Sequence, residues 1–351
     1  MLESGCWEIP ASLPACRTSR ITIGSCCSGW CSEVFAAQLL ELHAREVFAC
    51  ESWGPASLLT AATHDHIYFF EDAFRDFMSA PTVDVFVAGA PCGPWSQAGL
   101  GHGFDDDDGL LIFPILRWIE LRKPKVVILE QVDSLAKRHP EVLSLIIEVL
   151  RSFQGQAGQA EYQVSWQALN CRTHGFIPQN RGRLFIVAIR AQFAVQQMCW
   201  PGEVPAQPLS DFIDDDAGAG LLPFPGRMPG TATAKRNTRD IFEKVLLGGR
   251  DPLEVQLVMN VDGSQAHYNE NYCPCLTRSR AAAGGFWLSW RQRRTSTAEI
   301  CRLQGVDYDM LPEGVITQRQ LRQIAGNAIP VPLLARVMQA ALEAAGLVSL
   351  H

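Results

Sequence analysis

The chain contains the segment Val83-Asp84-Val85-Phe86-Val87-Ala88-Gly89-Ala90-Pro91-Cys92-Gly93-Pro94-Trp95-Ser96, an apolar run followed by a turn around one cysteine. The run over 83–87 is short and rich in valine, which predicts a strand buried in a parallel sheet. Gly and Pro on both sides of Cys92 indicate a sharp turn directly after that strand. Chemistry in open α/β sheets gathers past the carboxyl ends of strands, so Cys92 is placed to act as a nucleophile. A buried structural cysteine is the alternative interpretation.

Length and composition limit the class of protein. A chain of 351 residues allows one large α/β domain with a smaller second one. Apolar residues make up 47% and charged residues 19%, which predicts a packed core rather than disorder. Charges and prolines interrupt every long apolar run, and the first residues lack the pattern of a secretory leader. We therefore expect an intracellular protein without a membrane partner, nuclear if the host has a nucleus and otherwise cytoplasmic.

Cysteine usage and charge narrow the choice of partners. Twelve cysteines are scattered along the chain, and neither Cys26-Cys27 nor Cys273-Pro274-Cys275 has the spacing of a zinc site. We therefore expect no metal. The net charge of −7 gives no overall attraction to nucleic acid, so a nucleic-acid partner requires a local basic patch.

From Arg20 onward, predicted strands and helices alternate along the chain. The segment 20–33 predicts a strand, a turn of small residues including Ser28 and Gly29, and the start of a helix that continues to Leu42. Such a turn lets a cofactor approach the backbone and the helix N-terminus. The second strand, 47–50, ends at Glu51, which is placed to bind ribose hydroxyls. Asp72 precedes a helix predicted over 73–78 and is placed to reach a base or amine of the same ligand.

A second set of polar residues is predicted near Cys92. The strand over 124–132 carries Glu130, which falls at the same edge of the sheet as Cys92. Arg181 and Arg183 lie two apart on an extended segment, so they point to one side and suit contact with an anion or a polar base. Further strands are predicted over 162–169 and 183–188, and helices over 111–121 and 143–153. The fold class is therefore α/β.

The alternation ends at residue 191 and returns near residue 298. Between these points, basic residues are interleaved with Phe286, Trp287 and Trp290, a composition typical of a nucleic-acid-binding face. A solvated surface is the alternative. The basic residues are Lys235, Arg236, Arg239, Arg278, Arg280, Arg291, Arg293 and Arg294. Helical patterns resume over 298–304 and 331–345. The loop over 97–109 is rich in Gly and Asp, which suits either a lid or a plain connection.

Five motifs, in this order along the chain, resemble those of the cytosine-5 methyltransferases, which use S-adenosylmethionine and include a tRNA-methylating branch. They are Pro91-Cys92-Gly93-Pro94-Trp95-Ser96, Glu130-Gln131-Val132, Gln179-Asn180-Arg181-Gly182-Arg183, Arg302-Leu303-Gln304-Gly305-Val306 and Gly326-Asn327-Ala328-Ile329-Pro330. The resemblance implies a Rossmann-like methyltransferase sheet with a smaller, irregular target-recognition domain. Residues 1–17 show no helical or strand period and are predicted to be a short N-terminal arm. The resemblance places the catalytic domain at 18–190, the target-recognition domain at 191–294 and the completion of the catalytic domain at 295–351.

The resemblance also implies an activity and its residues. The activity is methyl transfer from S-adenosylmethionine to carbon 5 of cytosine in DNA through a covalent cysteine adduct, with a duplex base flipped out of the stack. Cys92 would attack carbon 6, Glu130 would hold ring nitrogen 3 and the exocyclic amine, and Arg181 and Arg183 would hold the base and the local backbone. Arg183 would also pair with Glu130. The implied cofactor-binding residues are Ser28, Gly29, Glu51, Asp72, Pro91 and Asn327.

The chain departs from the family pattern at several positions. Cys27 stands where the family has an aromatic residue near the adenine, Cys31 replaces a glycine, and Gly93 replaces the glutamine after the nucleophile. Further departures are Asp108, Gln131 and Ala298. Two alternative functions therefore stay open. One is the same chemistry on structured RNA such as tRNA, and the other is a catalytically silent methyltransferase-like protein that binds nucleic acid or a partner.

Overall fold

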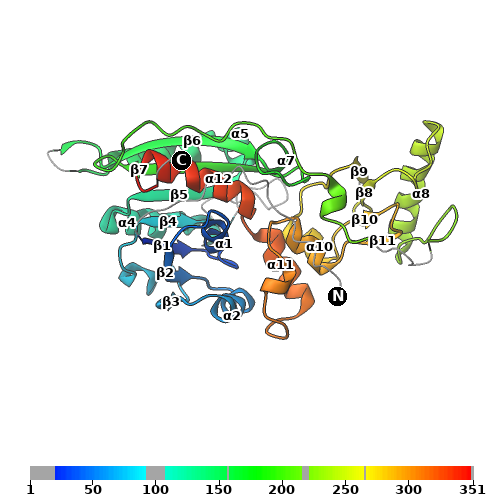
Figure 1. Cartoon of the computed structure of the whole chain (residues 1–351), viewed down its shortest axis with the longest axis horizontal. Coiled ribbons are helices and arrows are strands. Elements are labelled where there is room, and N and C mark those ends of the chain that lie inside the picture. The colour runs from blue at the N-terminus through cyan, green and yellow to red at the C-terminus, as the bar shows by residue number, and fades with distance from the viewer. Residues whose placement is uncertain (1–19, 92–106, 156–157, 216–220, 265, 349–351) are drawn as a thin grey trace.

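The computed structural model describes residues 20–91, 107–155, 158–215, 221–264 and 266–348. Over these ranges the chain forms a larger lobe around a seven-stranded sheet and a smaller lobe around a four-stranded sheet (Figure 1). This arrangement confirms the predicted α/β class with a smaller second unit. The arm predicted at 1–17 and the part of the predicted loop over 97–106 lie outside the described residues. No helix in the described ranges is both long and apolar enough to cross a membrane.

The larger sheet has the strand order β3-β2-β1-β4-β5-β7-β6. The first five of these strands run parallel, whereas β7 runs antiparallel to both of its neighbours. The carboxyl ends of β1, β2, β4 and β5 and the amino end of β7 therefore meet at one edge. The bounds are β1 Ile21–Cys26, β2 Ala44–Cys50, β3 Tyr68–Phe70, β4 Val85–Ala88, β5 Val126–Val132, β6 Tyr162–Asn170 and β7 Gly182–Arg190.

Helices cover both faces of this sheet because its central strands are apolar on both sides. In β4, Val85 and Val87 pack into the core that contains residues of α1, α2 and α12, whereas Phe86 and Ala88 pack against α4 and α6. Each strand therefore contributes alternate residues to two cores. The bounds are α1 Ser32–Leu39, α2 Gly54–Thr63, α4 Ile112–Arg122, α6 Pro140–Ser152 and α12 Val331–Ala344.

The smaller sheet has the order β11-β10-β8-β9 and is antiparallel. One of its faces, with Val258 and Leu288, belongs to the same core as α1 and α12, so one apolar core joins the two lobes. Its other face, with Leu257 and Met259, is covered by α8, which lies at the outer end of the molecule in Figure 1. The bounds are β8 Leu257–Asn260, β9 His267–Glu270, β10 Trp287–Leu288, β11 Arg293–Arg294 and α8 Ala232–Leu247.

Three further helices join the lobes. α9 (Arg278–Ala282) packs against α11 (Gln318–Asn327), and α11 in turn contacts α10 (Thr297–Arg302) and α2. α12 then returns to the larger sheet, where it packs against α1, β5 and β7. The segment around α9 falls inside the range 191–294 assigned above to target recognition, yet it packs on helices of the larger lobe.

Some predicted elements differ from the structure. The helix predicted over 73–78 is a turn followed by the 3₁₀ helix η1, Phe77–Ser79. The turn is stabilised by Asp72, whose carboxylate accepts the backbone N–H of Phe74 at 2.8 Å, a local bond that competes with helix formation. The helix α8 was not predicted, because Asn237 and Thr238 occupy buried positions in its first half and hide its apolar face.

Candidate active site

The shared edge of the larger sheet opens onto a cleft of about 1610 Å³. The described residues that the resemblance assigns to the site all line this cleft. They are Ser28, Gly29, Glu51, Asp72, Pro91, Glu130, Arg181, Arg183 and Asn327. The candidate nucleophile Cys92 lies outside the described residues, directly after Pro91. Residues from seven separate parts of the chain are thus brought to one cavity, as expected for a site at the carboxyl edge of an α/β sheet.

Glu130 and Arg183 form a buried ion pair in the cleft. Nε of Arg183 lies 2.7 Å from Oε1 of Glu130, and each side chain is 9% exposed. The pair forms because Arg183, near the start of β7, lies opposite Val132 on antiparallel β5, so its side chain reaches the diagonal neighbour Glu130. Burial raises the pKa of Glu130 above its ordinary value, although Arg183 and Arg181 act in the opposite direction. The ion pair that the family resemblance implies is therefore present.

The carboxylate of Glu130 lies beside the main chain that leads to Cys92. A Cβ atom placed on Gly89 would lie 3.5 Å from Oε2 of Glu130, an ordinary contact distance, so the carboxylate lies directly against this backbone. Gln131, which stands where the family has asparagine, donates from Nε2 to the carbonyl oxygen of Ala90 at 2.7 Å. The longer amide therefore supports the backbone immediately before Pro91.

Arg181 is completely buried and joins three segments. Its Nη2 donates to the carbonyl oxygens of Gly326 at 3.2 Å and Ala328 at 2.9 Å, and its Nη1 donates to that of Leu276. Burial lowers the pKa of its guanidinium below the ordinary value. Nη1 also lies 3.9 Å from Sγ of Cys275, so the buried guanidinium joins the segment before α9 to the end of α11, mainly through main-chain carbonyls.

The small-residue turn after β1 is bonded to the end of β2. Oγ of Ser28 accepts the N–H of Cys50 at 3.1 Å, and the Ser28 N–H donates to the Cys50 carbonyl at 3.1 Å. Oε2 of Glu51 accepts the N–H of Gly29 at 2.8 Å, while Oε1 accepts that of Trp53 at 2.9 Å. Gly29 has φ of 60°, and no atom lies within 4 Å of the position that its Cβ would take. The backbone here is therefore open to the cleft.

The remaining assigned residues lie toward the rim. Asp72 pairs with Arg75, whose Nε lies 3.2 Å from Oδ2, and Asn327 is an exposed residue at the end of α11. Sequence reasoning missed Trp53 and Arg278, which also line the cleft. The guanidinium of Arg278 stacks over the Trp53 ring at 4.5 Å, so α9 reaches across to the cofactor end. The sequence signals were the position of Trp53 two residues after Glu51 and the place of Arg278 in a cluster of basic residues.

The predicted basic and aromatic face is not formed as expected. Phe286 and Trp287 are buried in the cores of the small lobe, with 1% and 6% exposure. Arg280 and Arg294 both pair with Asp262, at 2.6 Å each. Their charges therefore balance internal carboxylates, and the interleaving reflects packing of the small sheet rather than one continuous nucleic-acid surface. The exposed cations of this set on α8 are Lys235, Arg236 and Arg239.

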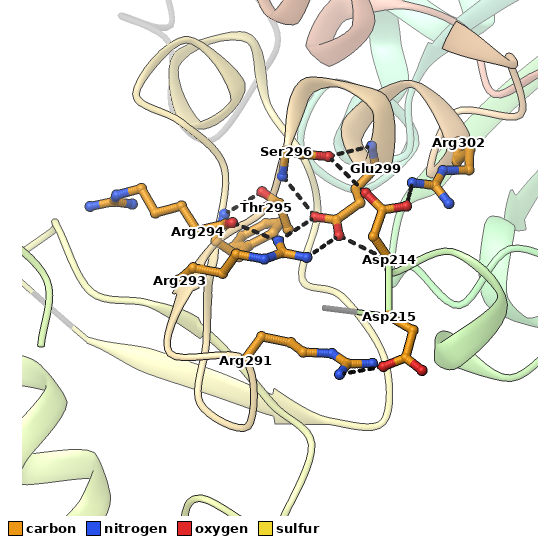
Figure 2. A network of polar contacts seen from close by, with 10 residues as sticks. Asp214, Asp215, Arg291, Arg293, Arg294, Thr295, Ser296, Glu299 and Arg302 are labelled. Atoms are coloured by element: carbon orange, nitrogen blue, oxygen red, sulfur yellow. Dashed lines mark hydrogen bonds and ion pairs between the residues drawn. The ribbon is translucent and has the colours of Figure 1, made fainter. Parts of the chain in front are cut away.

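The buried carboxylate of Glu299 links the two chain segments that connect the lobes (Figure 2). Glu299 is fully buried, and its Oε1 accepts the N–H of Asp214, where the chain enters the small lobe, at 2.9 Å. Arg293, where the chain leaves it, donates to both carboxylate oxygens at 2.7 and 2.9 Å. Ser296 completes a capping box with Glu299 at the start of α10. Arg294 points away from Glu299 in Figure 2.

Two further ion pairs surround this carboxylate. Arg302 pairs with Asp214, and Arg291 pairs with Asp215 at 2.9 Å (Figure 2). The second pair is more open to solvent, because the Asp215 side chain is 78% exposed. The connection between the lobes is therefore held by charged groups from both crossing segments and from α10.

Comparison with known proteins places this geometry in a family. Residues 61–247, more than half of the chain, match the family described as C-5 cytosine-specific DNA methylase. The type II methyltransferase M.Bsp6I of Bacillus sp. (strain RFL6) is 28% identical over 272 residues, which cover 74% of this chain and 78% of that protein.

Two solved structures share the fold. The Entamoeba histolytica methyltransferase EhMeth superposes with a TM-score of 0.63 at 14% identity, covering 93% of this chain and 98% of that one. The S. pombe Dnmt2 methyltransferase superposes with a TM-score of 0.58 at 14% identity, covering 93% and 99%. At this identity the likeness concerns the fold alone.

Proposed function

The chain belongs to the C-5 cytosine-specific DNA methylases, and we propose that it methylates carbon 5 of cytosine in DNA through a covalent adduct with Cys92. The observation that carries this proposal is the buried Glu130–Arg183 pair, which lies in the cleft at the end of β5, beside the backbone that leads to Cys92. The same cleft also contains Glu51 and the turn that follows β1. A cytosine near Glu130 and a methyl donor near Glu51 can therefore bind next to each other.

S-adenosylmethionine fits the second of these places and supplies an electrophilic methyl group. The open backbone at Gly29 allows a ligand to approach closely, and the Glu51 carboxylate retains acceptor capacity beyond its two backbone N–H donors, which suits ribose hydroxyls. Ser28 and Pro91 line the same region, and Asp72 and Asn327 lie at its rim, where they would meet the polar ends of the cofactor. We assign cofactor binding to these six residues.

Catalysis at the base is assigned to Cys92 and Glu130. Carbon 5 of cytosine is a poor nucleophile, and thiolate attack by Cys92 at carbon 6 turns the ring into an enamine-like species. Burial raises the pKa of Glu130, which favours a carboxyl that donates a hydrogen bond to ring nitrogen 3 as charge develops. Nε of Arg183, 2.7 Å from Oε1, holds that carboxyl in place.

Arg181 is assigned a supporting role. Its guanidinium donates to the carbonyl oxygens of Leu276, Gly326 and Ala328, which belong to two neighbouring segments, one before α9 and one at the end of α11. It therefore acts as a positioning residue that fixes the walls around the base. A cytosine within a duplex has to leave the stack to enter a cleft of this kind.

Radiolabelled methyl transfer tests the proposal. The full chain is incubated with methyl-labelled S-adenosylmethionine and either duplex DNA or total small RNA, alongside the Cys92→Ser and Glu130→Gln variants. We expect label in DNA, none with Cys92→Ser, and a turnover loss of about 10²- to 10⁴-fold with Glu130→Gln. Label in RNA alone would replace the substrate with structured RNA. Label in neither, despite cofactor binding, would indicate a silent binding protein, and label that persists with Cys92→Ser would refute the covalent step.

Trapping provides an independent measurement. With S-adenosylmethionine present, DNA that contains 5-fluorocytosine is methylated at carbon 5 while Cys92 is bound at carbon 6. Fluorine then stands where a proton must leave, so the methylated adduct cannot resolve. We expect a protein–DNA adduct stable to denaturant with the wild-type chain and no adduct with Cys92→Ser. An unmodified wild-type chain would contradict the proposed nucleophile.

A further inference from the structure

Three cysteine thiols meet at the floor of the cleft. Cys26 is the last residue of β1, Cys27 follows it, and Cys50 is the last residue of β2. All three line the cleft, and Cys27 and Cys50 are close enough to Cys26 to raise its pKa. None of them has a role in the methyl transfer described above, so the cluster calls for a separate explanation.

The positions of Cys26 and Cys50 suit a covalent link. They are direct partners in the register of two adjacent parallel strands. Neighbouring strands lie about 4.8 Å apart, which falls within the Cα separation of about 4.4–6.8 Å found in disulfides. The backbone therefore already has the spacing that a disulfide between them requires.

Access to the cluster is through Cys27. Cys26 and Cys50 are 1% and 2% exposed, whereas Cys27 is only partly buried. Hydrogen bonds to its two neighbours and burial raise the pKa of Cys26 well above its ordinary value, so Cys26 is held as the thiol. A small oxidant that enters the cleft meets the Cys27 sulfur first.

The same backbone holds the proposed cofactor turn. The peptide groups of Cys50 exchange hydrogen bonds with Ser28, and the next residue, Glu51, binds the N–H of Gly29. A new bond from the Cys50 side chain to the end of β1 would alter both contacts. Chemistry at the thiols is therefore coupled to the shape of the cofactor end of the cleft.

We propose that Cys26, Cys27 and Cys50 form an oxidation site for hydroperoxides, and that a disulfide between Cys26 and Cys50 weakens cofactor binding. The effect on binding rests on the proposed function, because it assumes that S-adenosylmethionine occupies this end of the cleft. The disulfide itself does not depend on that assumption.

The steps balance with one hydroperoxide as the oxidant. The Cys27 sulfur attacks a peroxide oxygen, the O–O bond breaks, and the thiol proton leaves with the other oxygen as an alcohol. The Cys26 sulfur displaces hydroxide from the resulting sulfenic acid, and its proton converts the hydroxide to water. Cys50 then exchanges with this disulfide, bonding to Cys26 and returning Cys27 to a thiol. Two thiols are oxidised by two electrons in total.

Peptide mapping tests the disulfide. Because Cys92 is also a thiol, the experiment uses the full-length Cys92→Ser chain, treated with hydrogen peroxide and then with an alkylating reagent. Trypsin cleaves after Arg20, Arg45 and Arg75, so Cys26 and Cys50 fall in separate peptides, 21–45 and 46–75. We expect these peptides to become joined, with a loss of 2 Da that a reducing agent reverses. The link should be absent in Cys26→Ser and Cys50→Ser and should form more slowly in Cys27→Ser.

Calorimetry with S-adenosylhomocysteine tests the effect on binding. We expect the Kd of the oxidised protein to rise at least tenfold and to recover on reduction, with Cys199→Ser, an exposed cysteine outside the cleft lining, behaving as the parent. Absence of the joined peptides, or an unchanged Kd in the joined protein, would overturn the proposal. If the reduced protein did not bind the analogue, the cofactor part of the proposed function would fail, and the claimed effect on binding would fail with it.

Discussion

Arg183, the second residue of β7, pairs with Glu130 near the end of the antiparallel neighbour β5. The distance between Nε and Oε1 is 2.7 Å, and both side chains are buried. A buried carboxylate that loses such a partner is left without compensation, at a cost of about 3–5 kcal/mol. We therefore expect Arg183→Met to lower the free energy of unfolding by about that amount at pH 7, measured by urea denaturation.

The matched control for this variant is Arg250→Met. Arg250 pairs with Glu270 at 2.8 Å, but the two side chains are 47% and 34% exposed, so this change should cost less than about 1 kcal/mol. Because burial raises the pKa of Glu130 above its ordinary value, the carboxylate takes up its proton in the folded chain before the unfolded one as the pH falls, and the loss in Arg183→Met should shrink. Equal losses in the two variants would show that the Glu130 pair contributes little.

Glu299 should stabilise the connection between the lobes more than the neighbouring charged residue Arg291 does. Its carboxylate accepts from Asp214, Arg293 and Ser296, and Glu299→Gln keeps the shape while removing the charge. Since charged hydrogen bonds are worth about 1.5–3 kcal/mol each, we expect a loss of about 3 kcal/mol in the free energy of unfolding. Hydrogen exchange should become faster near Asp214 and in β11. Arg291→Gln, which removes the exposed pair with Asp215, should leave both measurements nearly unchanged.

Glu33 should make stability depend on pH. It is fully buried in α1, and burial raises its pKa from 4.5 to about 7. The folded chain therefore holds a proton that the unfolded chain releases. The stabilisation that protonated Glu33 adds to the free energy of unfolding is complete below about pH 4.5 and is lost as the pH rises through about 7.

The variant Glu33→Gln removes this dependence. Between pH 5 and 7 the difference in unfolding free energy should move in favour of the variant by up to about 1.4 kcal/mol per pH unit, and above about pH 7.5 it should be constant. His66, whose pKa burial lowers to about 4, changes stability in the opposite direction, but it is present in both proteins and cancels in the difference. A difference that does not vary with pH would contradict the assignment.

Gly326 should not tolerate a side chain. A Cβ atom there would lie 2.7 Å from the carbonyl oxygen of Thr277 and 2.8 Å from the backbone nitrogen of Arg278, and neither is the end of a flexible side chain. We expect Gly326→Ala to separate α9 from α11 and to cost about 1–3 kcal/mol. Gly54→Ala is the control, because its Cβ would meet nothing within 4 Å. A thermal melt of both variants measures the effect, and equal melting temperatures would refute the close packing.

Much of the larger lobe was predictable from local pattern. The strands β1, β2, β4, β5, β6 and β7 all lie close to the predicted ranges, because runs of apolar residues bounded by turns identify buried strands directly. The helices α8 and α11 were missed. Asn237 is buried in α8 because its Nδ2 donates to the carbonyl oxygens of Val261 and Gly263, and no periodicity of apolar residues reveals such a bond.

Part of the candidate site was likewise predictable from the sequence, and part was not. Glu51 was identified from its place after the second strand, Glu130 from its place near the end of a strand, and Arg183 from its spacing from Arg181. The structure brings all three to one cleft. The clustering of arginines with Phe286 and Trp287 suggested an open binding face, whereas the structure uses Arg280 and Arg294 to balance Asp262. Charge partners far apart in the chain decide whether a cation is available, and composition does not contain that information.

By itself, the sequence determined the α/β class, the family resemblance and the residue types at the sheet edge, because these depend on short-range periodicity and on motifs read in order. Only the tertiary structure decided which groups face one another. The antiparallel strand β7 brings Arg183 to Glu130, and Arg181 donates hydrogen bonds to three carbonyl oxygens. The pairing of β1 with β2 brings Cys26 beside Cys50. Such contacts depend on strand order and register, which are set by long-range packing rather than by neighbours along the chain.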